Sequence, residues 1–88
     1  MSSVSNQDVK DIIKNSKIEV SKMGQKTTVV HCTLPNGFEL VESSACVHPE
    51  DYAENVGRAV CMEKITDKVW MLLGYVRQEE VSAKKARG

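Results

Sequence analysis

Apolar residues near the start of the chain follow the spacing of one helix face. Within residues 6–15 they recur at intervals of three and four: Val9, Ile12 and Ile13. Asn6 stands just ahead of this pattern, where an asparagine side chain can cap the first turn. We therefore predict a short helix over residues 6–15, preceded by a flexible leader over residues 1–5.

Three later segments have strand patterns. Residues 17–21 alternate apolar and polar side chains, and residues 26–34 are rich in β-branched side chains. The dipeptide Asn36-Gly37 predicts a tight hairpin, because both residues tolerate positive φ, and residues 38–41 form the return strand. These patterns predict a small antiparallel sheet in which the first strand pairs with the second strand or with a partner chain.

A two-residue hairpin loop would fix the register of the last two strands. It pairs Cys32 with Val41, and it pairs His31 with Glu42 as an exposed cross-strand ion pair. One face of the sheet then carries Thr28, Val30, Cys32, Leu34 and Val41. The other face carries Val29, His31, Thr33, Phe38 and Leu40. Since both faces hold apolar side chains, we expect a helix to cover one face and a second subunit to cover the other.

The longest apolar stripe predicts a helix from Pro49 to Leu73. Apolar residues recur there at steps of three and four, and proline suits the first helical position. Gly74 is expected to cap the C-terminus of this helix. Gly57, inside the helix, indicates close approach of another backbone, either within the chain or across a dimer. Residues 81–88 are expected to form a mobile basic tail.

These elements define the fold class α+β, with residues 6–80 as a single domain. It comprises a short N-terminal helix, a small antiparallel sheet with an Asn-Gly hairpin, and one long C-terminal helix packed on the sheet. The chain has only one Phe, one Trp and two Tyr among 88 residues, so its core is small. Oligomerisation is one way in which such a small domain gains stability.

Composition narrows the classes of partner. Twelve Lys and Arg balance twelve Asp and Glu, which argues against a sequence-blind nucleic-acid binder and against a polybasic membrane surface. No apolar run approaches the roughly 20 residues needed to cross a bilayer. The first residues lack the basic start and apolar core of a secretion signal, so we expect a soluble intracellular protein without membrane contact.

The residues that could carry chemistry do not form a recognised motif. Cys32, Cys46 and Cys61 are an odd number without C-x-x-C spacing, which fits reduced, buried thiols better than a zinc site. His31 and Cys32 are neighbours on a strand and point to opposite faces, so they cannot form a catalytic dyad. The sequence also lacks G-x-S-x-G, H-E-x-x-H and a phosphate-binding glycine loop. We therefore expect no enzymatic activity, no metal and no cofactor.

Several blocks of the sequence occur in an order typical of one viral family. They are Leu34-Pro35-Asn36-Gly37-Phe38, the segment from Glu42 to Glu50, Gly57-Arg58, and the segment from Lys68 to Tyr75. Over roughly residues 27–80 the chain resembles the small tailed-phage proteins labelled after gene product 49 and gene product 66 of two phages. His48 departs from the family pattern, which usually has Asp, a helix N-cap, at that position. The resemblance implies a phage accessory protein in the cytoplasm of an infected bacterium and carries no known activity.

The first functional hypothesis is a binding module that modulates a host bacterial protein, with anti-defence as one such role, and that forms a homo-oligomer. Its predicted interface residues are Val29, Phe38, Leu40, Trp70 and Tyr75. Trp70 lies at the edge of the apolar stripe, either as a rim residue of the core or as an interface anchor.

A second hypothesis is sequestration of a small nucleotide-like ligand between subunits. His31, Arg58 and the basic tail over residues 81–88 would be its charged contacts. Nucleic-acid binding is a weaker third hypothesis, because the net charge is zero and aromatic side chains are few.

Overall fold

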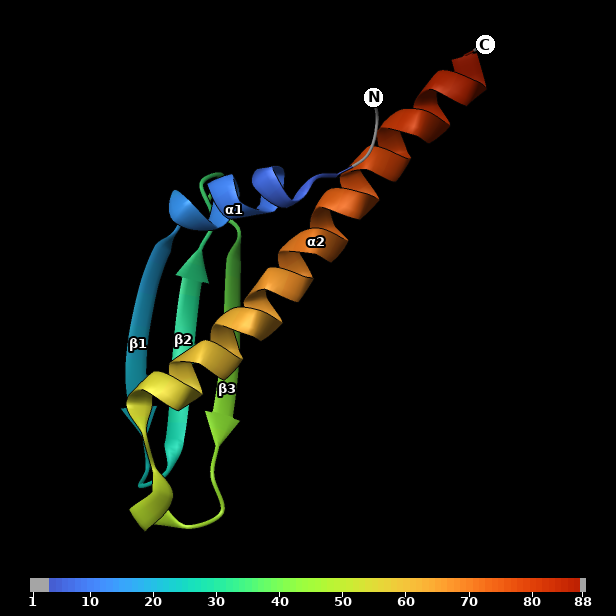
Figure 1. Cartoon of the computed structure of the whole chain (residues 1–88). Helices are drawn as coiled ribbons and strands as arrows, with labels where there is room; N and C mark the ends of the chain where they lie inside the picture. The colour runs from blue at the N-terminus through green and yellow to red at the C-terminus, as the bar shows by residue number, and fades with distance from the viewer. Residues whose placement is uncertain (1–3, 88) are drawn as a thin grey trace.

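The computed structural model describes residues 4–87 and shows an α+β fold, as the sequence predicts (Figure 1). The elements in chain order are α1 (Asn6–Lys14), β1 (Lys17–Met23), β2 (Thr27–Thr33), β3 (Glu39–Ala45), the 3-10 turn η1 (Pro49–Asp51) and α2 (Glu54–Arg87). The three strands form an antiparallel sheet in the order β1-β2-β3. The first strand therefore pairs with the second strand of its own chain.

Helix α1 is capped by Ser5 rather than by Asn6. The Ser5 hydroxyl accepts a hydrogen bond from the Asp8 amide, and the Asp8 carboxylate accepts one from the Ser5 amide, each over 3.1 Å. This reciprocal capping box satisfies amides that the first helical turn leaves without partners. Ser5 therefore belongs to the helix start and not to a leader, while residues 1–3 of the predicted leader lie outside the described residues.

The register between β2 and β3 differs by one residue from the prediction. Cys32 pairs with Leu40, and His31 pairs with Val41 instead of Glu42. Because side chains alternate along a strand, a slip of one residue moves every β3 side chain to the opposite face. Leu40 accordingly packs into the core with 9% exposure, and Val41 lies on the other face with 55% exposure.

The cause of this shift is a three-residue loop in place of the two-residue loop. The Gly37 amide donates to the Leu34 carbonyl over 2.8 Å, and Gly37 has a φ of 93°. This is a β-turn followed by a left-handed glycine, with proline at the turn position that suits its fixed φ. A two-residue type I′ loop would need positive φ at Asn36, and no described residue other than glycine has it.

Helix α2 crosses one face of the sheet and forms the core against it (Figure 1). The buried side chains of this layer are Val30, Cys32, Leu34, Leu40, Cys61, Ile65 and Val69. At the edge of the layer, Lys64 Nζ donates to the Ser43 carbonyl over 2.8 Å, and Lys68 pairs with the half-buried Glu42 carboxylate. Two lysines one helical turn apart therefore tie α2 to β3.

The long helix begins later than predicted. Pro49–Asp51 form a separate 3-10 turn, and Tyr52 is extended, with a ψ of 131°. In this position the Tyr52 hydroxyl accepts a hydrogen bond from the buried Thr28 hydroxyl over 3.1 Å, and Lys22 lies 4.5 Å from the centre of its ring. The tyrosine is thus fixed to the sheet by two side chains, and α2 starts two residues further on.

The helix also ends later than predicted. Gly74 has no positive φ and lies inside α2, which continues to Arg87. Residues 77–87 include good helix formers, and Arg77 pairs with Glu80 over 2.8 Å. Residues 81–87 of the predicted tail are therefore helical, and their mobility stays a prediction. This extension projects beyond the sheet and gives the molecule dimensions of 60 × 22 × 19 Å (Figure 1).

Candidate functional site

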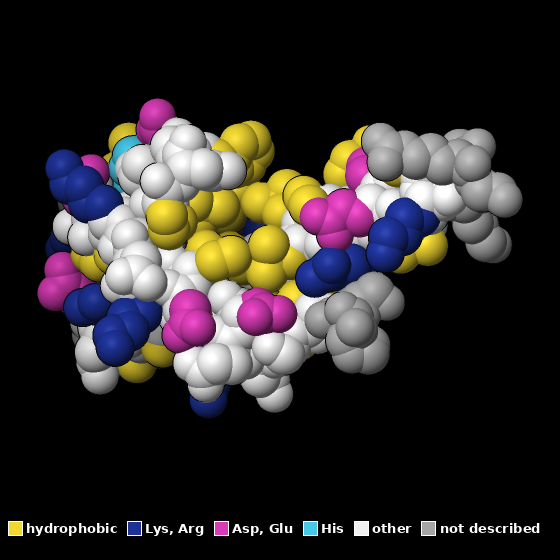
Figure 2. Space-filling view, turned by 90° about the horizontal axis from the view of Figure 1, so that it is seen from above, with side chains coloured by type: hydrophobic (Ala, Val, Ile, Leu, Met, Phe, Trp, Pro, Cys, Tyr) yellow, Lys and Arg dark blue, Asp and Glu magenta, His cyan; other side chains and the backbone are white. Residues whose placement is uncertain are grey.

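The strongest candidate site is an apolar groove where α1, the β2–β3 hairpin and α2 meet. Its volume is about 360 Å³, and it is lined by Ile12, Leu34, Pro35, Asn36, Phe38, Val69, Leu72, Leu73, Tyr75 and Val76. Figure 2 shows hydrophobic side chains gathered between the end of the sheet and the projecting helix. We refer to this surface as the groove.

Three large side chains of the groove are exposed to solvent. Phe38 is 51% exposed, Tyr75 is 67% exposed and Val76 is 53% exposed. Phe38 follows the hairpin loop, whereas the other two lie on α2 just past the edge of the sheet. Exposed aromatic and aliphatic side chains around a concave surface are typical of interaction sites.

The five predicted interface residues lie in different parts of the structure. Phe38 and Tyr75 lie together in the groove. Trp70 is partly buried against the core, which agrees with a rim residue, and Leu40 lies inside the core. Val29 is half-buried on the sheet face that α2 does not cover. Leu40 therefore cannot belong to an interface in this fold, because a partner cannot reach its side chain.

A hollow next to the groove has acidic walls. It has a volume of about 390 Å³ between α1 and the projecting part of α2, and it shares Ile12, Leu73 and Val76 with the groove. Asp8, Asp11, Arg77 and Glu80 line the rest of it together with Val4. Because Arg77 pairs with Glu80, the net negative charge of the hollow comes from the two aspartates of α1.

The open face of the sheet is mostly polar, unlike the apolar face expected from the sequence. Within residues 4–87 no helix packs on it, and its side chains are Lys17, Glu19, Ser21, Met23, Thr27, Val29, His31, Thr33, Glu39, Val41, Ser43 and Ala45. The expectation of a second apolar face depended on Leu40 and Phe38. The register places Leu40 in the core, and Phe38 lies at the groove.

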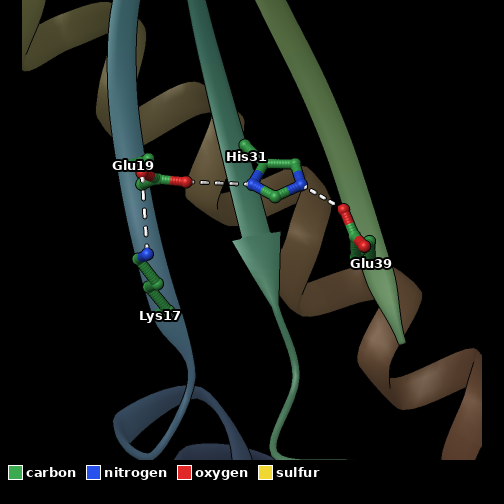
Figure 3. A network of polar contacts seen from close by, with 4 residues as sticks. All are labelled: Lys17, Glu19, His31 and Glu39. Carbon is green, nitrogen blue, oxygen red and sulfur yellow. Dashed lines mark hydrogen bonds and ion pairs between the residues drawn. The ribbon is translucent and has the colours of Figure 1, made fainter. Parts of the chain in front are cut away.

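His31 lies at the centre of this open face between two carboxylates (Figure 3). Its Nε2 is 2.6 Å from Glu39 Oε1, and its Nδ1 is 3.3 Å from Glu19 Oε1. Lys17 Nζ is 3.9 Å from the second oxygen of Glu19. The hydrogen bond to Glu39 and, after it, the hydrogen bond to Glu19 raise the pKa of His31 above its ordinary value. The two carboxylates thus favour the charged form of the imidazole.

The Glu39→Gln substitution is expected to lower the pKa of His31, because it removes the charge on its strongest partner. Since the pKa of His31 is raised by folding, its stabilising effect is complete below the unfolded pKa and is lost as pH rises through the folded pKa. The difference in unfolding free energy between the unchanged protein and E39Q should therefore shrink from mildly acidic to alkaline pH. Proton NMR titration of His31 and urea unfolding measure the two effects.

The control for this experiment is Glu63→Gln. It changes an exposed glutamate of α2, the helix that covers the other face of the sheet. A titration midpoint of His31 that is the same in E39Q and E63Q would contradict the assigned cause of the pKa shift.

The two predicted ligand contacts do not meet within one chain. His31 lies on the open face of the sheet, and Arg58 is an exposed residue of α2, which covers the opposite face. The two carboxylates beside His31 also disfavour an anionic ligand there. Sequestration of a nucleotide-like ligand thus stays a prediction from the sequence without support from this geometry.

The three cysteines are free thiols in the structure. Cys32 and Cys61 are buried, and burial raises the pKa of each thiol, which favours the neutral form. Cys46 is partly exposed, and its thiol donates to the His48 carbonyl over 3.2 Å. Among the described residues, no group of three or more His, Cys, Asp and Glu side chains is placed to hold a metal ion.

Sequence reasoning missed several groove residues. Leu72 and Val76 continue the apolar stripe of α2 beyond the sheet edge, and Val76 follows the glycine at which the helix was expected to end. Pro35 was placed beside the predicted two-residue loop and was not considered as a groove residue. The persistence of apolar residues on one helix face beyond Gly74 was the available signal.

The structure is that of a small α+β protein with an exposed apolar groove. Comparison with known families identifies it further: the phage protein (N4 Gp49/phage Sf6 gene 66) family matches residues 4–81, and the chain belongs to this family. The match begins well before residue 27, so it includes α1 and β1 as well as the blocks noted in the sequence. Neither the curated proteins nor the solved structures gave a match. None of the helices in residues 4–87 combines the length and the apolar character needed to span a membrane.

Proposed function

We propose that this chain is a phage accessory protein that acts by binding: as a homo-oligomer it modulates a protein of the infected host, such as a component of a defence system. The groove is the observation that supports this proposal most. It is built from three separate elements and exposes Phe38 and Tyr75 on a domain with few aromatic side chains. Membership of a phage family supplies the setting, and the host cytoplasm is the compartment we propose.

Binding is favoured over catalysis by the chemistry of this surface. The lining of the groove is apolar apart from the Tyr75 hydroxyl and Asn36, whose side-chain oxygen accepts a hydrogen bond from the Phe38 amide over 3.0 Å. The carboxylates Asp8, Asp11 and Glu80 line the neighbouring hollow and are exposed. Such a surface can bury apolar side chains of a partner, but it holds no acid–base pair next to a nucleophile.

The Phe38→Ala substitution tests the proposal. Truncation of this half-exposed ring removes apolar contact area from the groove while leaving the core intact, so we expect recovery of the bound host protein to fall about tenfold. The tagged full chain is used for affinity capture from infected cells, and the recovered host protein is quantified by mass spectrometry. Val47→Ala, at an exposed position outside the groove, is the matched control. Equal recovery with F38A and V47A would count against the groove as the binding surface.

A further inference from the structure

We propose that the groove receives the C-terminal part of α2 from a second copy of the chain, in a two-fold dimer whose α2 helices are antiparallel. This inference rests on the proposed function and deepens it: the groove holds a second copy of the chain, so host binding that depends on Phe38 requires the assembled dimer. Four observations carry it: the projection of α2, the residues along its inner face, the distribution of charge around the groove, and the size of the groove.

The first observation is the unsupported end of α2. Beyond Val76 the helix leaves the sheet and continues to Arg87 (Figure 1). The side chains described there are mostly charged or polar, with Val81 and Ala83 as exceptions. A helical segment gains most of its stability from packing against another surface. A second copy would supply that surface for the projecting segment.

The second observation is the complementary size of residues along one helix face. Leu72, Val76 and Ala83 are spaced by four and seven residues, so they lie along one stripe of α2. With a two-fold axis near residue 78, the second copy's Ala83 lies beside Leu73 of the first copy, and its Lys84 lies beside Leu72. A small side chain opposite a leucine allows two helices to approach closely.

The third observation is charge complementarity. The hollow that continues the groove has the Asp8 and Asp11 carboxylates in its wall, and Arg77 and Glu80 in the same hollow neutralise each other. Lys84 is the last side chain of α2 that the structure describes, and it is basic. An antiparallel arrangement brings this basic end of one copy to the acidic wall of the other. In a two-fold dimer the same attraction occurs twice.

The fourth observation is the size of the groove. A volume of about 360 Å³ accommodates only a few side chains, whereas stable protein interfaces bury about 1,200–2,000 Å² in total. A two-fold pairing fills two grooves at once and adds the contact between the two α2 helices. A second copy therefore meets the area requirement better than one short peptide segment does.

Sedimentation equilibrium of the full chain tests the arrangement. The unchanged protein should dimerise. Val76→Asp should weaken dimerisation at least ~100-fold, because the aspartate charge would be buried between the two copies. Val56→Asp is the matched control, since Val56 lies in the same helix with 59% exposure against 53% for Val76. Both positions are open to solvent in one chain, so both variants should keep the unchanged circular dichroism spectrum. A monomeric unchanged protein, or equal weakening by V56D, would overturn the inference.

A charge swap tests the orientation of the two helices. Asp11→Lys and Lys84→Glu should each weaken dimerisation about tenfold at low salt, and the combined variant D11K/K84E should restore it. Failure of the swap to restore the dimer would overturn the antiparallel arrangement. Host-protein capture then separates the two proposals. If the unchanged protein is a monomer and F38A still abolishes capture, the dimer is refuted but host binding is not. If the protein is a dimer and captures no host protein, the host-binding role alone is refuted.

Discussion

Replacement of Gly57 by alanine is expected to destabilise the protein, although the same change inside a helix usually stabilises it. Gly57 lies in α2 directly over the central strand, at the buried residue Thr28. A Cβ at position 57 would lie 2.2 Å from the Thr28 hydroxyl oxygen and 2.7 Å from its Cβ. Neither atom can move away easily, because β2 is paired on both sides and the hydroxyl is bonded to Tyr52. Helix and strand must therefore separate.

The expected size of this effect follows from two opposing contributions. Overpacking of a well-packed core costs about 3 kcal/mol at the upper end, and alanine gains about 1 kcal/mol over glycine in a helix. The net loss of unfolding free energy for G57A should then be about 2 kcal/mol, measured by urea denaturation. Gly74→Ala is the matched control in the same helix, since a Cβ there meets nothing within 4 Å. It should raise stability by up to about 1 kcal/mol.

A companion substitution examines the cause of the Gly57 effect. Thr28→Ala removes the hydroxyl and methyl groups that a new Cβ at position 57 would meet but keeps the Cβ of residue 28 at 2.7 Å, so it relieves the clash in part, and T28A/G57A should lose less stability than the sum of the two single changes. If G57A proved as stable as G74A, helix and strand would not be in contact at this point, and the position of α2 on the sheet would be wrong.

The close approach at Gly57 illustrates what the sequence can and cannot predict. A glycine inside a helical pattern indicated a close neighbour, but the neighbour was open between the chain itself and a dimer partner. The structure shows the side chain of Thr28 in the same chain. The alternation within β2 was predicted correctly, because local periodicity determines which side chains share a face: Thr28, Val30, Cys32 and Leu34.

The pairing of strands was harder to predict than the strands themselves. A choice between a two-residue and a three-residue loop at Pro35-Asn36-Gly37 decides whether Leu40 or Val41 enters the core. The sequence supports either loop, because Asn-Gly suits the shorter one and the preceding proline suits the longer one. The same choice replaced Glu42 beside His31 by Glu39, whereas Glu19 lies beside His31 because β1 pairs with β2.

The groove could not be predicted from the sequence in its full extent. Ile12, Phe38 and Val76 come from three elements and meet only through the tertiary arrangement. Phe38 was predicted to lie on the second apolar face of the sheet, and Tyr75 was predicted to follow the end of the long helix, so nothing in the prediction brought the two together. Their juxtaposition depends on the continuation of α2 past Gly74, whereas local rules of helix capping predicted that the helix ends at this glycine.

Ile65→Ala is expected to have the largest effect on stability. Ile65 is the largest fully buried side chain and lies in the centre of the layer between α2 and the sheet. Removal of three carbon atoms from a fully packed site costs about 2–5 kcal/mol, a large share of the roughly 5–15 kcal/mol that stabilises a typical domain. Thermal and urea unfolding should both show this loss, and Ile65→Val, which keeps the branched Cβ, should cost about 1 kcal/mol.

The matched control for Ile65→Ala is Met71→Ala, at a position of the same helix that is 65% exposed. It should change stability by less than about 0.5 kcal/mol. Because Ile65 holds α2 on the sheet, its truncation should also loosen Leu72 and Val76 against the hairpin and weaken any binding through the groove. A stable I65A variant with an intact groove would show that the hairpin and α1 hold the projecting helix independently of the core.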